Sequence, residues 1–76
     1  MKDLLTFIAK TLVDSPDEVS VEERETETEI ILELRVAKED MGKVIGKQGR
    51  IAKAIRTVIK ASNHDPDKKA VVDIMD

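Results

Sequence analysis

A pair of glycines lies between two stretches of helical periodicity and constrains the fold more than any other feature of this chain. The segment around them reads Val44-Ile45-Gly46-Lys47-Gln48-Gly49-Arg50-Ile51. Glycine lets a backbone turn sharply and lets another backbone approach closely, because it carries no Cβ. The spacing therefore predicts a tight turn between a short helix over Lys38 to Ile45 and a longer helix over Arg50 to Ser62.

Apolar periodicity elsewhere predicts one more helix and three strands. Over Met1 to Val13 apolar residues recur at helical spacing, whereas over Ile30 to Val36 every second residue is apolar, as in a half-buried strand. Val19 to Glu25 is interpreted as an acidic edge strand that pairs antiparallel with Ile30 to Val36, and Ala70 to Met75 as a closing strand. The α-β-β-α-α-β order predicts a single α+β domain over residues 1–76, in which three helices cover one face of a three-stranded sheet.

The longer helix separates apolar from basic side chains. One face is expected to carry Ile51, Ile55, Val58, Ile59 and Ser62. The opposite face is expected to carry Arg50, Lys53, Thr57 and Lys60. We therefore expect a basic stripe along this helix, with Ile45, Ile51 and Ile55 in the core. We also expect Gly42 to let two elements pack closely.

Charge is divided unevenly along the chain, although the net charge is only −3. The segment from Asp14 to Glu33 holds nine acidic residues and one basic residue, whereas Lys38 to Lys60 holds seven basic and two acidic residues. A cationic segment attracts phosphate locally, while an acidic remainder limits indiscriminate binding. The turn also opens a helix, so it has free backbone amides and lies at the positive end of the helix dipole. Together with Lys47 and Arg50, these features predict phosphate binding. Lys53 extends the basic surface by one helical turn.

The turn, its flanking isoleucines, the basic helix and the element order together resemble the KH domains, and in particular their type II, bacterial form. The resemblance covers the whole chain and is closest to the small stand-alone bacterial KH proteins of the KhpA type. It implies that the turn clamps single-stranded RNA or DNA, with bases in a shallow apolar groove near Val44. The predicted RNA-binding residues are Lys43, Val44, Gly46, Lys47, Gln48, Gly49, Arg50 and Lys53.

Several other functions lack the residues that they need. A P-loop fails, because Met41 stands where its first glycine belongs and Gln48 follows Lys47. The chain has no cysteine, and its one histidine, His64, lies in a predicted loop with too few converging ligands for a metal. No arrangement of serine, histidine and carboxylate predicts catalysis, so we expect no enzyme activity, no metal and no cofactor.

The expected function is that of a cytoplasmic RNA-binding protein, serving as a post-transcriptional regulator or an RNA-chaperone-like factor. Phe7 is the only aromatic residue, so bases cannot stack on rings as they do in other RNA-binding modules. The resemblance also implies self-association as a homodimer and pairing with a larger KH-containing RNA-binding protein. The alternative is a protein-interaction module that keeps the fold and acts through such homo- or hetero-dimers.

Overall fold

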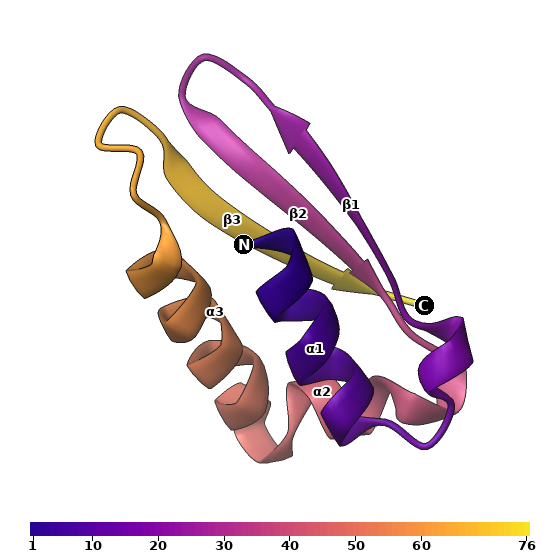
Figure 1. Cartoon of the computed structure of the whole chain (residues 1–76). Helices are drawn as coiled ribbons and strands as arrows, with labels where there is room; N and C mark the ends of the chain where they lie inside the picture. Colours follow the sequence, from indigo (N-terminus) through magenta and orange to yellow (C-terminus); the bar gives the residue numbers. More distant parts are fainter.

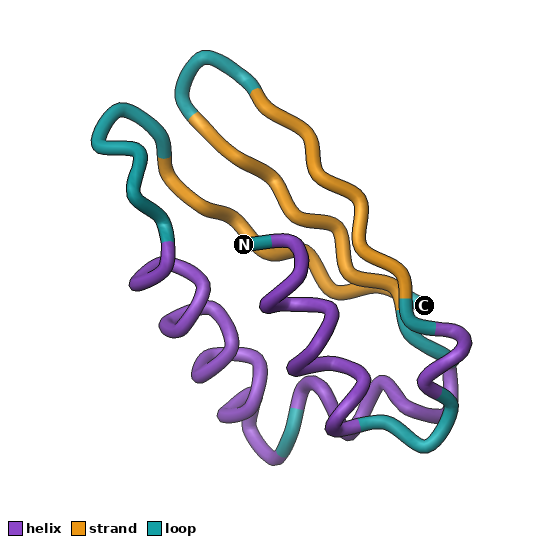
Figure 2. Tube along the Cα trace, viewed as in Figure 1, coloured by secondary structure: helices purple, strands orange, loops and turns teal.

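The computed structural model describes residues 1–76 and has two layers (Figure 1). A three-stranded sheet forms one layer, and three helices cover one of its faces, as the sequence predicts (Figure 2). The helices and strands are α1 (Lys2–Leu12), β1 (Ser20–Glu25), β2 (Glu29–Arg35), α2 (Met41–Ile45), α3 (Arg50–Ser62) and β3 (Lys69–Met75). Short 3₁₀ turns cover Pro16–Glu18, Lys38–Asp40 and Lys47–Gly49. None of the helices is long and apolar enough to cross a membrane.

The sheet has the strand order β1-β2-β3, with β1 at one edge. Strand β1 pairs antiparallel with β2, which confirms the predicted hairpin, and β3 pairs parallel with β2 on its other side. The hairpin turns without a glycine, because the Thr26 hydroxyl accepts hydrogen bonds from the Thr28 and Glu29 amides at 3.2 and 2.9 Å. The side chain thus supports the turn, as short hydroxyl residues commonly do.

The hydrophobic core lies between the sheet and the helices. On β2 the side chains of Ile30, Leu32 and Leu34 are buried, as the predicted alternation requires. Leu5 of α1 and Ile59 of α3 are completely buried and belong to one cluster with Leu32 and Leu34. Because β2 and β3 run parallel, the chain between them must cross over the sheet. Helix α3 is part of this crossover and therefore lies against the sheet.

Three details of the helices differ from the prediction. The segment Lys38 to Ile45 is divided into a 3₁₀ turn and the short helix α2. Ile45, at the end of α2, is 37% exposed and does not lie in the core as predicted. Val58 lies on the apolar side of α3 but is 45% exposed, because α3 turns Ala52, Ile55 and Ile59 toward the sheet. A Cβ at Gly42 would meet no atom within 4 Å, so Gly42 is not needed for close packing.

Candidate nucleic-acid interface

The turn between α2 and α3, Gly46 to Gly49, depends on its two glycines in different ways; we call it the glycine turn. Gly46, Gln48 and Gly49 have φ angles of 75°, 58° and 73°, in the region that side chains disfavour. A Cβ at Gly46 would also lie 2.6 Å from Cγ1 of Ile51, whereas a Cβ at Gly49 would meet nothing within 4 Å. Gly46 is therefore required by both conformation and space, and Gly49 by conformation alone.

The glycine amides are not free donors. The Gly46 N–H donates to the Gly42 carbonyl at 2.9 Å, and the Gly49 N–H donates to the Gly46 carbonyl at 3.1 Å. The expectation that the turn donates backbone N–H groups to phosphates therefore does not extend to these two amides. The two glycines shape the turn, and exposed basic side chains supply positive charge there.

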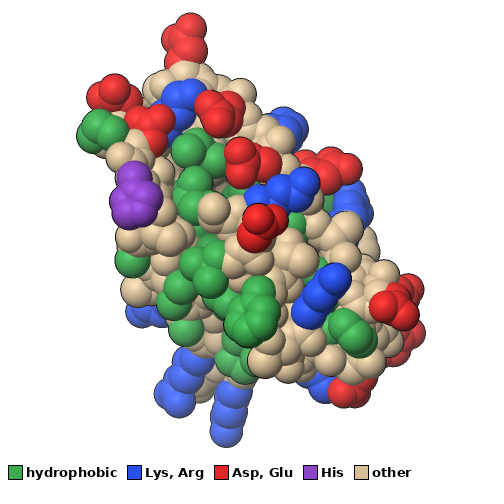
Figure 3. All heavy atoms as spheres, in the orientation of Figure 1, with side chains coloured by type: hydrophobic (Ala, Val, Ile, Leu, Met, Phe, Trp, Pro, Cys, Tyr) green, Lys and Arg blue, Asp and Glu red, His purple; other side chains and the backbone are tan.

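Three predicted basic residues lie exposed at or just after the glycine turn. Lys47 belongs to the turn, Arg50 opens α3, and Lys53 follows one helical turn later. Arg50 Nη2 donates to Gln48 Oε1 at 3.3 Å, so the first residue of the helix is tied to the turn. Lysine and arginine side chains project from the lower end of the molecule in Figure 3, where Figure 1 places this turn. Aspartate and glutamate lie mostly at the upper end and along the right side of that view.

Two predicted binding residues are not brought to this surface. Val44 is completely buried in the core, so its side chain supports the turn from within. Lys43 Nζ lies 3.0 Å from Asp14 Oδ2 and 3.6 Å from Asp40 Oδ1. Hydrogen bonding and charge from Asp14 raise the pKa of Lys43 above its usual value. Lys43 is therefore engaged in an ion-pair cluster and is not free for a phosphate.

Asp40 has a buried carboxylate that the sequence does not reveal, because there it is one of two acidic residues within a basic segment. Asp40 is 2% exposed, and its two oxygens accept the amides of Asp14 and Ser15 at 3.3 and 3.0 Å. It precedes α2, yet its side chain makes no bond to the amides of that helix. Asp40 thus anchors the start of α2 to the connection between α1 and β1.

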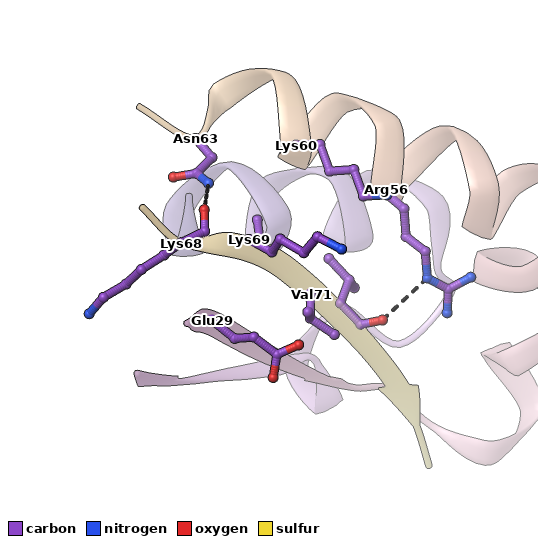
Figure 4. A pocket seen from close by; sticks show the side chains of 9 residues that line it. Glu29, Arg56, Lys60, Asn63, Lys68, Lys69 and Val71 are labelled. Carbon is purple, nitrogen blue, oxygen red and sulfur yellow. Dashed lines mark hydrogen bonds between the residues drawn. The ribbon is translucent and has the colours of Figure 1, made fainter. Parts of the chain in front are cut away.

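A cleft of about 500 Å³ lies between α3 and the outer edge of β3 (Figure 4); we call it the basic groove. Arg56 and Lys60 reach toward it from α3, and Lys69 reaches toward it from β3. Arg56 Nε donates to the Val72 carbonyl at 3.3 Å. The sequence alone does not single out Arg56 and Lys69, because the groove forms only where β3, paired with β2, lies beside α3.

The connection between α3 and β3 contributes Asn63 and Lys68 to the lining of the basic groove and is held by several contacts. Asn63 Nδ2 donates to the Lys68 carbonyl at 2.8 Å, which holds this connection in a compact turn. Lys68 Nζ lies 2.8 Å from Glu25 Oε2 at the end of β1, and this hydrogen bond raises the pKa of Lys68. The connection is therefore tied to the hairpin rather than free to cover the groove.

A second cleft, of about 420 Å³, is apolar and lies between α1 and α3. Phe7, the neighbour of the lining residue Ile8 on α1, is 69% exposed, more than any other large apolar side chain. Hydrophobic atoms are prominent on the face of the molecule seen in Figure 3, over which α1 passes in Figure 1. We define the apolar face by Leu4, Phe7 and Ile8 of α1 and by Ile51, Ala54 and Val58 of α3.

Known proteins are similar to this chain along almost its whole length. The family described as "KhpA/KhpB, KH domain" matches residues 2–74. The RNA-binding protein KhpA of Clostridium acetobutylicum is 68% identical over 75 residues, which cover 99% of this chain and all of that protein. The protein of the same name from Clostridium perfringens is 63% identical with the same coverage.

A solved structure shows the same fold in a larger protein. Era of Aquifex aeolicus, bound to GDP and aluminium fluoride, superposes with a TM-score of 0.69 at 18% sequence identity. The match covers 97% of this chain and 29% of Era. At this identity the likeness concerns the fold alone.

Proposed function

The chain belongs to the KhpA/KhpB family of KH domains, and on that premise we propose that it is a cytoplasmic protein that binds single-stranded RNA. The observation that carries the proposal is the row of exposed basic side chains at the glycine turn and along the start of α3. The name shared by its relatives supports the same assignment. Bound to RNA, the protein acts as a post-transcriptional regulator or an RNA-chaperone-like factor.

The phosphate backbone lies against the glycine turn in this proposal. Lys47 and Arg50 neutralise phosphates, and Lys53 extends the charged path along α3. The bond from Arg50 to Gln48 orients the guanidinium toward the turn before RNA arrives. The basic groove continues from the same helix, so bases turn into it while the backbone follows the helix surface.

Salt dependence tests this arrangement directly. Each phosphate neutralised on a single strand contributes a slope of about −0.7 to the plot of log K against log salt concentration. Contacts from Lys47, Arg50 and Lys53 therefore predict a slope of about −2 for a short fluorescent RNA measured by anisotropy. Lys53→Met should reduce the slope by about 0.7, whereas the exposed control Lys2→Met should not change it. An affinity independent of salt would contradict the proposal.

We also propose that two copies associate through the apolar face. Asp3, Phe7 and Lys10 are exposed and follow one side of α1 at helical spacing. When two α1 helices lie antiparallel across a two-fold axis near Phe7, Asp3 of each copy faces Lys10 of the other. The pattern is therefore self-complementary in both charge and apolar content. A larger KH-containing protein with such a face could pair here in the same way.

Light scattering after size-exclusion chromatography, with and without RNA, separates the two proposals. A mass that rises to twice the monomer mass with increasing concentration, in the absence of RNA, supports association through protein alone. A monomer at every concentration would contradict self-association and leave RNA binding intact. Association without any RNA binding would instead favour a pure protein-interaction module.

A further inference from the structure

The glycine turn lies next to the C-terminal end of α1. Arg50, the residue after the turn, lines the same apolar cleft as Ile8 and Leu12 of α1. In Figure 1 the end of α1 and the turn lie together at the lower end of the molecule. The basic surface at the turn therefore adjoins the apolar face at one end of α1.

A dimer formed through the apolar face has a defined arrangement of its two glycine turns. Phe7 is the midpoint of α1, so a two-fold axis there that makes the α1 helices antiparallel places the turns at opposite ends of the α1 pair. The apolar face includes α1 and α3, so this axis crosses both helices and keeps both turns on the α3 side. With Leu12 about 7.5 Å beyond Phe7 along α1 and the spacing of packed helices added, the turns lie about 20 Å apart.

The same axis makes the two α3 helices antiparallel. In the proposed mode of binding, an RNA backbone follows α3 from the glycine turn past Lys53. Two strands bound in this way, one by each copy, therefore run in opposite directions. Base pairing joins strands that run in opposite directions, so the dimer holds two strands in the relative orientation of a duplex.

We propose that the dimer accelerates the annealing of two complementary single-stranded RNAs, one held at each glycine turn. This inference rests on the proposed RNA binding and self-association. Holding two strands close together raises their effective concentration to about the millimolar range. Lys47, Arg50 and Lys53 also neutralise phosphates, which reduces the repulsion between the strands as they approach.

Annealing of two complementary RNAs of about 12 nucleotides, one with a donor and one with an acceptor fluorophore, measures this activity through energy transfer. At concentrations where light scattering gives a dimer, the protein should accelerate annealing by at least about tenfold. The rate should pass through a maximum and fall when protein is in excess, because the two strands then occupy separate dimers. A rate that only rises with protein concentration would indicate charge screening and would overturn the inference.

Asp3 and Lys10 allow the dimer to be removed and restored without a change at the glycine turn, because both are exposed on α1. Asp3→Lys leaves lysine at both positions and Lys10→Asp leaves aspartate at both, so each variant repels its own copy. The two variants are complementary to each other, and an equal mixture has the same total charge as the unaltered protein. Each variant alone should lose the acceleration, and the mixture should recover it.

Binding of a short RNA, measured by anisotropy, separates this inference from the proposed function. Each variant should bind a single short strand within about threefold of the unaltered protein. Acceleration by either variant alone that equals that of the mixture would overturn the inference and leave RNA binding in place. An unaltered protein that binds the short strand without accelerating annealing would overturn it as well. Failure to bind the short strand would overturn the proposed function and the inference with it.

Discussion

The two exposed sides of α3 differ sharply in chemistry although they belong to one helix. One side carries Lys53, Arg56 and Lys60, and the other carries Ile51, Ala54 and Val58. Only Ala52, Ile55 and Ile59 are buried, so a narrow stripe holds the helix to the sheet. A small domain can therefore carry a charged surface for RNA and an apolar surface for protein on one helix, because only a narrow stripe of that helix packs into the core.

Gly46→Ala should produce the largest effect, because Gly46 holds the turn from which the basic side begins. A left-handed backbone costs about 1–2 kcal/mol for a residue with a Cβ. The clash with Ile51 adds about 1–3 kcal/mol of overpacking. We expect unfolding in urea to show a loss of about 2–5 kcal/mol, together with weakened RNA binding.

Gly42→Ala is the control for that substitution. Gly42 lies in α2 with open space around it, so alanine should stabilise the protein by up to about 1 kcal/mol through helix propensity. A Gly46→Ala protein as stable as the Gly42→Ala protein would mean that the turn has another conformation in solution.

Asp40→Ala should have the next largest effect on stability and should leave the basic and apolar sides of α3 unchanged. It leaves the Asp14 and Ser15 amides without their carboxylate partner, at a cost of about 2 kcal/mol in the free energy of unfolding. The exposed neighbour Glu39 is the control, since Glu39→Ala removes the same charge without these bonds. Equal unfolding curves for the two variants would show that Asp40 does not anchor α2.

Val58→Lys should have the smallest effect on stability and the clearest effect on association of two copies through the apolar face. Val58 is already half exposed, so lysine fits without disturbing the core, but it places a charge in the proposed contact between copies. We expect a monomer in light scattering, with the affinity for a short RNA unchanged within about twofold. Ser20→Lys on β1 is the control, and a dimer that survives Val58→Lys would place the contact elsewhere.

Local patterns were sufficient to predict the elements and the glycine turn. The alternation along β2 and the paired glycines carry their own structural signals, because each depends on neighbours in sequence. The contacts of Asp40 and Arg56 could not be predicted in this way, since their partners lie 25 and 16 residues away. The exposure of Val58 on the predicted apolar face could not be predicted either, because periodicity gives the apolar arc of a helix but not the part of that arc that the sheet covers.

The central claim is that the glycine turn is the phosphate-binding site, and a charge reversal there tests it most directly. Lys47 and Gln48 are exposed, and aspartate tolerates the left-handed backbone at Gln48, so Lys47→Asp with Gln48→Asp should fold. Lys2→Asp with Ser20→Asp changes the net charge equally at exposed positions on α1 and β1. The account predicts that the first pair abolishes binding of a short single-stranded RNA and that the second pair does not. Equal binding by the two folded variants would contradict it.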